Sequence, residues 1–149
     1  MLKIEEFKFS FSWLSNFWFC DVMFEGVKYP TVEHAYQAAK FSDTSAKELI
    51  RRAETAGKAK KLGGVNGLPN SFREDWEQVK VSIMKDLLRE KFKNPHMRDK
   101  LIATKDSILE EGNHWHDRFW GICPPGSNQG QNILGKLLME VREEIKEEE

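Results

Sequence analysis

The sequence predicts one α+β domain, residues 1–149, that is predominantly helical and carries a small N-terminal antiparallel β-sheet. Three observations lead to this prediction. A length of 149 residues fits a single domain with a substantial hydrophobic core. Apolar and polar residues alternate near the N-terminus, as they do in half-buried strands. Farther along the chain, helix-capping residues precede segments with helical spacing of apolar residues.

The first thirty residues favour strands and turns. Period-two alternation predicts strands at 3–5 and 7–11, and a further strand is expected within 17–24. A turn at 25–26 then leads into a short return strand, which predicts an antiparallel hairpin at 19–29.

The rest of the chain favours helices, each preceded by a residue that can cap or start one. The expected helices are 31–41 after Thr31, 45–53 opened by a capping box at Ser45, 58–62 after Gly57, 72–92 opened by a capping box at Ser71, 95–103 after Asn94, and a last helix after Asn132. A short strand is expected at 107–110 and a long loop at 112–131. The charged tail, 143–149, is expected to be solvated and frayed.

Composition excludes several classes of function. Lys plus Arg number 23 and Asp plus Glu 24, for a net charge of −1, which argues against a protein that coats duplex DNA. Cys20 and Cys123 form no CxxC motif, and no disulfide framework is expected. The N-terminus lacks the profile of a signal peptide, and no apolar run has the length of a membrane span. We therefore expect a cytoplasmic protein without a membrane association.

A polar row stands out in the helix expected at 31–41. Glu33, Gln37 and Lys40 follow i, i+4, i+7 spacing, so their side chains project from one face. Spacing by itself favours a solvated face with a weak charge pair. The alternative is a functional row of carboxylate, amide and ammonium groups.

A second candidate is the aromatic loop at 113–121. Its tryptophans and phenylalanine are too apolar for water, which predicts that the loop packs inward and brings Asp117 to the edge of the core. Such a carboxylate is either functional, paired with Arg118, or the cap of a turn. His114, His116 and Asp117 do not make a closed ligand set, so no metal site is expected.

Two further segments have the composition of anion sites. The glycine-containing loop at 124–132 precedes a helix N-terminus, and Lys58, Lys60 and Lys61 follow Gly57. Each segment is equally well explained as a solvated loop or helical turn.

The motifs, taken together, resemble those of one known family. Residues 11–17 (FSWLSNF) and 29–41 (YPTVEHAYQAAKF) resemble the opening signature of the YbiA-like, or NADAR, family. Three later pieces agree in order: 57–63 (GKAKKLG), Asp117-x-x-Trp120-Gly121, and 132–139 (NILGKLLM). The chain is identified on these motifs as a member of that family.

The resemblance implies an enzyme that hydrolyses an N-glycosidic bond of a ribose without a cofactor. Two substrates are implied: phosphoribosylamino-pyrimidine intermediates of riboflavin synthesis, or ADP-ribosylated guanine in nucleic acid, the latter with a toxin as a candidate partner. The family's catalytic Glu, Trp and Asp correspond to Glu33, Trp76 and Asp117.

This chemistry suits the residues themselves. Glu33 and Asp117 are expected to lie within about ten ångström of each other, where one stabilises an oxocarbenium-like state and the other orients water or ribose hydroxyls. Trp76 would stack on the base, and Lys40 would bind phosphate or form a Schiff base with the opened sugar. The other expected substrate contacts are Asn16, Phe17, Gln37, Lys58, Lys61, Trp120, Gly121 and Asn132. A non-catalytic module that senses ADP-ribose or a nucleotide is the alternative, although paired carboxylates near a polyanion argue against it.

Overall fold

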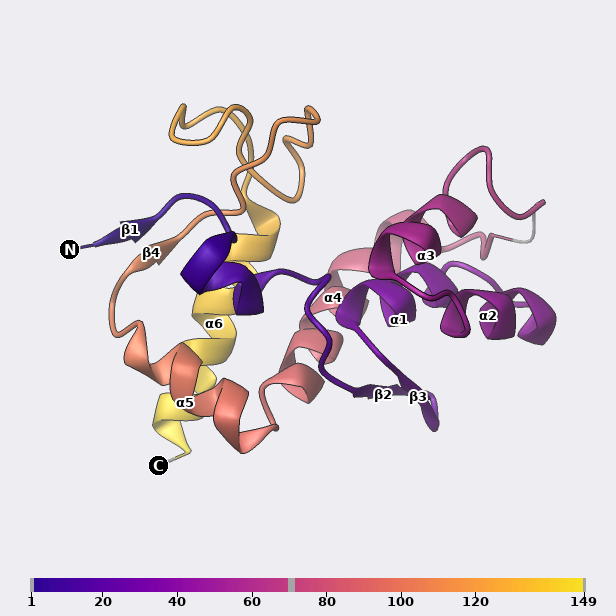
Figure 1. The fold of residues 1–149 in the computed structure, drawn as a ribbon, viewed down its shortest axis with the longest axis horizontal. Helices are drawn as coiled ribbons and strands as arrows, with labels where there is room; N and C mark the ends of the chain where they lie inside the picture. Colours follow the sequence, from indigo (N-terminus) through magenta and orange to yellow (C-terminus); the bar gives the residue numbers. More distant parts are fainter. Residues whose placement is uncertain (1, 70–71, 149) are drawn as a thin grey trace. The chain divides into compact units, whose positions relative to one another are not determined.

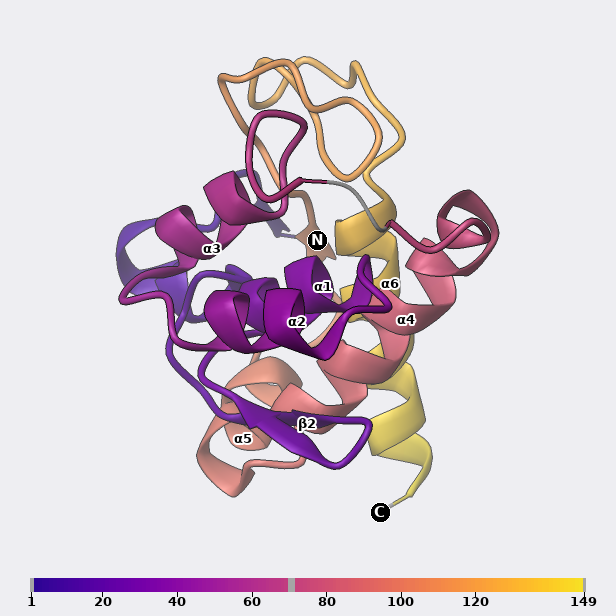
Figure 2. The ribbon, with the colours of Figure 1, turned by 90° about the vertical axis from the view of Figure 1, so that its right-hand side faces the viewer.

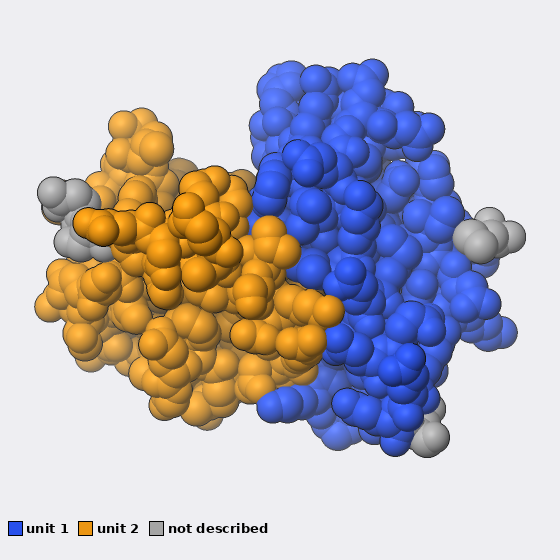
Figure 3. All heavy atoms as spheres, turned by 180° about the vertical axis from the view of Figure 1, so that it is seen from behind, with its two compact units in different colours: residues 1–15, 92–149 blue, residues 16–91 orange. Residues whose placement is uncertain are grey.

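The structure is a computed structural model that describes residues 2–69 and 72–148. The chain divides into two compact units, coloured separately in Figure 3. Unit 2 is the continuous segment Asn16–Lys91, and unit 1 combines Met1–Ser15 with Phe92–Glu149. Helices dominate and the strands are short, so the α+β class expected from the sequence is confirmed.

Unit 2 contains an antiparallel hairpin followed by four helices. Its elements are β2 (Val22–Phe24), β3 (Val27–Tyr29), α1 (Val32–Ala39), α2 (Thr44–Arg51), α3 (Ala56–Leu62) and α4 (Trp76–Lys91). Val22 pairs with Tyr29 and Phe24 with Val27, which confirms the expected hairpin. The first strand is shorter than expected, because only the residues next to the turn join the ladder.

Helix α1 is the core of unit 2. It packs against α2, α3 and α4, and Figures 1 and 2 show α2 and α3 beside it. All eight of its residues are buried. Ala35, Ala38 and Ala39 are completely covered, because their small side chains let the neighbouring helices approach closely.

Side-chain caps set the start of each short helix in unit 2. The Thr31 hydroxyl accepts from the backbone N–H of His34, as expected. Helix α2 is capped by Asp43, whose carboxylate accepts from the N–H of Ser45, so the capping box expected at Ser45 is wrong by two residues. Thr55 caps α3, which includes Gly57 rather than following it.

Helix α4 begins later than the expected residue 72. The N–H of Arg73 donates to the carbonyl of Lys40, and its guanidinium binds Asp75, so both side chain and backbone are engaged outside a helix. The carbonyl of Asp75 then accepts from Gln78 and Val79 as the first turn forms. The capping box expected at Ser71 lies outside the described residues.

Unit 1 is built on two helices and a minimal sheet. Its elements are β1 (Lys3–Ile4), the 3₁₀ helix η1 (Phe9–Leu14), α5 (Pro95–Ala103), β4 (Ile108–Leu109) and α6 (Ile133–Glu147). Strands β1 and β4 run parallel, a pairing that the sequence did not predict. Helix α6 packs against α5 and β4 through its buried leucines, valine and isoleucine.

The strand expected at 7–11 is wrong, because those residues lead into η1. Phe9 has a φ of 54°, which breaks an extended chain. The Ser12 hydroxyl then donates to the carbonyl of Phe9, and the indole of Trp13 donates to that of Ser10. The alternating aromatic residues therefore follow a tight helix, in which Trp13 packs edge-on against Phe92.

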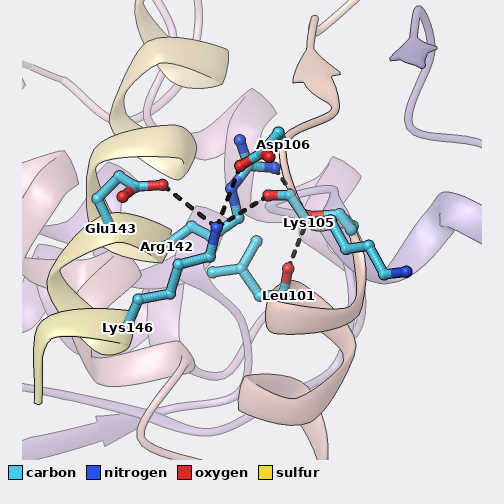
Figure 4. Close-up of polar contacts among 7 residues, drawn as sticks. Leu101, Lys105, Asp106, Arg142, Glu143 and Lys146 are labelled. Carbon is cyan, nitrogen blue, oxygen red and sulfur yellow. Dashed lines mark hydrogen bonds and ion pairs between the residues drawn. The ribbon is translucent and has the colours of Figure 1, made fainter. Parts of the chain in front are cut away.

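Polar contacts join the last turns of α5 and α6 in unit 1 (Figure 4). Lys146 donates to the carbonyl of Lys105 at 3.2 Å and lies 3.4 Å from an Asp106 carboxylate oxygen. Arg142 donates to the Thr104 hydroxyl at 2.8 Å. Cations at a helix C-terminus oppose its partial negative charge. Helix α6 continues to Glu147, so the fraying expected from residue 143 onwards is not found among the described residues.

Within the described part of the chain, none of the helices combines the length and the apolar character that crossing a membrane requires.

Replacing Thr31 by alanine should destabilise unit 2 more than the same change at Thr55. Both threonines cap a helix, but Thr31 is fully buried and also lies 2.7 Å from Nδ1 of His34. Losing the cap costs about 1 kcal/mol, and leaving a buried ring nitrogen without a partner costs about 1–3 kcal/mol more. Urea unfolding of both variants checks this, and equal losses would contradict it.

The cost of replacing His34 by glutamine should shrink as the pH falls. Its Nε2 donates to the Ala53 carbonyl and its Nδ1 accepts from Thr31, an assignment that fits neutral imidazole. Burial lowers the pKa of His34 below 6.5, more than the bond to Ala53 raises it. As the pH falls, His34 is therefore protonated in the unfolded chain at a higher pH than in the folded protein. Wild-type stability accordingly falls as the pH drops through about 6.5. Unfolding free energies of both proteins from pH 8 to 5 test this; a cost that grows towards pH 5 would contradict it.

Candidate active site

The polar row of α1 is buried rather than solvated. The side chains of Glu33 and Gln37 belong to residues that are only 7% and 4% exposed. The Gln37 amide donates to Oε2 of Glu33 at 2.6 Å, which confirms that the two share one face. The solvated face that spacing favoured is therefore wrong. A carboxylate kept out of water needs hydrogen bonds and is a candidate for chemistry.

Lys40 ends the row as the C-cap of α1. Its ammonium donates to the carbonyl of Gly63 at 3.2 Å and lies over the rings of Tyr36 and Phe72, 5.6 and 6.0 Å from their centroids. Burial lowers the pKa of Lys40 below 10.5, and the negative charge of Glu33 opposes that shift. The aromatic faces supply some of the stabilisation that water would otherwise give to the cation.

Asn16, which precedes α1 in the chain, is hydrogen-bonded to the first turn of that helix. Its backbone carbonyl accepts from the N–H of Glu33 at 3.1 Å, in the first turn of α1. Its side-chain amide donates to the sulfur of Met84 at 3.5 Å, and its buried Oδ1 accepts nothing among the described residues. Asn16 is therefore fixed to α1 through its backbone and to α4 through its amide, and its contact with substrate stays a prediction.

Aromatic rings adjoin this row. Trp76, the first residue of α4, packs against Tyr36 with ring centroids 5.1 Å apart and planes tilted by 55°. Trp76 is half-buried, so part of its indole stays accessible for a planar group. Phe17 is 42% exposed. The structure thus brings together Asn16, Glu33, Gln37, Lys40, Tyr36 and Trp76.

The lysines of α3 do not join the buried row. Lys58 is exposed and forms an ion pair with Glu54 at 2.9 Å, while Lys61 is exposed in the last turn of the helix. Their expected contact with phosphate stays a prediction.

In unit 1, the segment expected to be a loop at 112–131 is held by an internal network. Figures 1 and 2 show it folded back on itself at the N-terminal end of α6. Gly112 and Ile122 form a parallel bridge, and the carbonyls of Phe119 and Trp120 accept from the first N–H groups of α6. Asn113 is fully buried, and its amide bonds to the Glu111 carboxylate and to backbone groups of the following turn. These contacts tie the segment together and to the first turn of α6.

Asp117 caps a turn in this segment. Its Oδ1 accepts from the N–H groups of Phe119 and Trp120, at 3.1 and 2.9 Å. The pairing with Arg118 that the sequence allowed does not form, because Arg118 donates instead to the carbonyl of Cys123. The cap leaves Oδ2 of the half-buried carboxylate without a hydrogen bond inside the described residues.

Asn132 and Gly121 have structural roles that explain their identity. Asn132 was expected to cap α6, but it sits at a φ of 51° and its amide joins two other segments, donating to Leu109 and accepting from Glu111. A side-chain carbon at Gly121 would come within 2.1 Å of the Glu111 carbonyl oxygen. Trp120 is half-buried and meets Phe119 edge-on.

No group of three or more His, Cys, Asp or Glu side chains is gathered for a metal ion among residues 2–69 and 72–148.

Sequence reasoning missed several residues that shape the site. Tyr36 and Gly63 contact Lys40 of the polar row, and Met84 contacts Asn16. Asn113 organises the turn that Asp117 caps. Tyr36 could have been noticed, because it lies one helical turn before Lys40. Gly63 and Met84 approach from α3 and α4, and nothing in local spacing reveals such contacts.

Known proteins resemble this chain over most of its length. A profile of the NADAR domain family matches residues 5–146. A riboflavin biosynthesis protein of Vibrio vulnificus is 40% identical over 135 residues, covering 90% of this chain, although the chain spans only 35% of that protein. The N-glycosidase YbiA of Escherichia coli is 38% identical over 132 residues, covering 88% of this chain and 79% of the relative.

The fold has a solved counterpart. The NMR structure of Escherichia coli YbiA matches with a TM-score of 0.82 and 34% identity, covering 99% of this chain and 85% of the other. The α+β fold expected from the sequence is thereby confirmed, and relatives named N-glycosidase confirm the enzyme class, an N-glycosyl hydrolase. The match of the family profile over nearly the whole chain shows that this protein belongs to the NADAR family.

Proposed function

We propose that this chain hydrolyses the bond between C1 of a phosphorylated ribose and a nitrogen of an amino-pyrimidine. The observation that carries the proposal is the buried Glu33 carboxylate, held by Gln37 at 2.6 Å and followed two turns later by the partly buried Lys40. Breaking a glycosidic C–N bond builds positive charge on the sugar, and a fixed carboxylate in low-dielectric surroundings stabilises that charge strongly.

The reaction needs one water and no cofactor. As the C1–N bond breaks, its electron pair goes to the nitrogen and the sugar becomes cation-like. Water then attacks C1, and its oxygen becomes the new hydroxyl. One proton of that water passes to the departing nitrogen, with Glu33 or Asp117 as the carrier. The products are a free sugar phosphate and an amine.

The remaining residues of the site bind and orient. The half-buried indole of Trp76, set against Tyr36, suits stacking on a pyrimidine ring. Asn16 has a buried acceptor and Gln37 a second one, which suit donors on a ribose or an amino-pyrimidine. Asp117 enters on the family resemblance, and its expected distance of about ten ångström from Glu33 stays a prediction.

The amino-pyrimidine is favoured over ADP-ribosylated guanine by the names of the relatives, which include riboflavin biosynthesis proteins. Guanine in nucleic acid, with a toxin as partner, is the second substrate that the family implies. A sensor without catalysis is the third alternative, and the rigidity of the Glu33–Gln37 pair opposes it, because simple binding of an anion gains nothing from a buried carboxylate.

Glu33→Gln should abolish turnover while leaving the ligand bound. The substitution keeps the shape and removes the charge, so kcat should fall by at least about 10²-fold. Both substrates are assayed side by side with products identified by mass: a phosphoribosylamino-pyrimidine, and an oligonucleotide that carries ADP-ribose on guanine. Glu74→Gln, at an exposed position, is the matched control and should behave as wild type.

The two arms separate the alternatives. Release of ribose 5-phosphate alone supports the proposed substrate, whereas release of ADP-ribose alone would replace it with the nucleic-acid substrate. Binding without turnover in either arm, unchanged by Glu33→Gln, would support the non-catalytic sensor instead.

Lys40 should titrate differently in variants of its charged neighbours. Removing the negative charge with Glu33→Gln should lower the pKa of Lys40 further, and removing a positive charge with Lys60→Gln should raise it, because these charges respectively stabilise and oppose the ammonium. NMR titration of isotopically labelled lysines, assigned with Lys40→Arg, measures both shifts. Movement in the same direction in both variants would refute this electrostatic account.

A further inference from the structure

Gly63 lies where two side chains of the polar row meet α3. It is buried and forms the C-cap of that helix, with φ −86° and ψ 0°. Any residue can adopt this backbone conformation, so the angles do not require glycine. A reason for glycine at this position must come from the surrounding atoms.

Those atoms belong to Gln37. A side-chain carbon built on Gly63 would lie 2.1 Å from Oε1 of Gln37 and 2.9 Å from its Cβ and Cδ. Non-bonded carbon and oxygen atoms require about 1 Å more than the first of these distances, since dispersion contacts are optimal near 3.5 Å. A side chain at position 63 would therefore push the Gln37 amide away.

The Gln37 amide has little room to yield. Its nitrogen donates to Oε2 of Glu33 at 2.6 Å, and the residue is only 4% exposed. Any displacement of the amide by a group at position 63 breaks or lengthens this hydrogen bond. The Glu33 carboxylate then loses the donor that fixes one of its oxygens.

The backbone of Gly63 acts on the other end of the row. Its carbonyl accepts from the Lys40 ammonium at 3.2 Å. One residue thus contacts both the amide that holds Glu33 and the amine that ends the row.

We infer that Gly63 is a positioning residue of the N-glycosidase site: its missing side chain gives the Gln37 amide the space from which it orients Glu33, and its carbonyl anchors Lys40. This inference rests on the proposed function. Gly63 itself touches no substrate and acts through the two side chains.

The test compares Gly63→Ala, Gln37→Ala and the double variant with wild type, using the intact chain and the substrate that wild type turns over. Gly57→Ala is the matched control, because Gly57 lies in α3, the helix that Gly63 caps, and its new carbon would meet nothing closer than 3.9 Å. Circular dichroism and thermal unfolding show that each variant is folded, and kcat and KM are measured separately.

Gly63→Ala should lower kcat by about 10²-fold with little change in KM, the loss typical of a 1 Å misplacement of a catalytic group. In the Gln37→Ala background, the same substitution should change kcat by less than about threefold, because the side chain that it displaces is gone. Gly57→Ala should keep the wild-type kcat.

Three outcomes would overturn the inference. One is a wild-type kcat in folded Gly63→Ala; another is a full additional loss in the double variant. If Gly63→Ala does not fold, a wild-type kcat in Gln37→Ala shows that there is no orienting amide for Gly63 to accommodate. A wild-type protein without turnover on either substrate would instead refute the proposed function itself.

Discussion

The complete burial of α1 is the constraint on which unit 2 depends. Eight consecutive residues lie out of water, and three of them, Glu33, His34 and Gln37, are polar. Each must find its hydrogen bonds inside the protein. His34 bonds to Thr31 and Ala53, which ties the start of the helix to the end of α2. Glu33 and Gln37 bond to each other, while Oε1 of Gln37 has no hydrogen-bond partner among the described residues.

This arrangement has a thermodynamic cost, which the proposed function would account for. A buried carboxylate lowers stability unless its environment compensates for lost hydration, and an apolar pair of the same size would fill the space more favourably. Fixed dipoles around a charge are, however, the condition for stabilising a cationic transition state without reorganisation. The rings of Tyr36 and Phe72 face the Lys40 ammonium in the same region. A loss of stability around α1 is what a preorganised site of the proposed kind would cost.

Local sequence signals predicted the hairpin, most helices and the shared face of Glu33 and Gln37, because turns, caps and helical periodicity act over a few residues. They failed where distant segments decide. The alternating aromatics at 7–11 imitate a strand, although Trp13 packs on Phe92 from far along the chain. Burial of the polar row depends on α2, α3 and α4, which cover it from later positions. The amide of Asn132 bonds to β4 and Glu111 instead of to its own helix, for the same reason.

The parallel pairing of β1 with β4 also affects how the chain folds while it is being synthesised. Unit 2 is continuous and ends at Lys91, so all of its contacts are available once that residue has left the ribosome. Strand β1 is made first, but its partner residues, Ile108 and Leu109, emerge only after the whole of unit 2. Long-range pairings of this kind form late. Strand β1 therefore stays unpaired while unit 2 is being made. Folding during translation accordingly begins with unit 2, and unit 1 is completed afterwards.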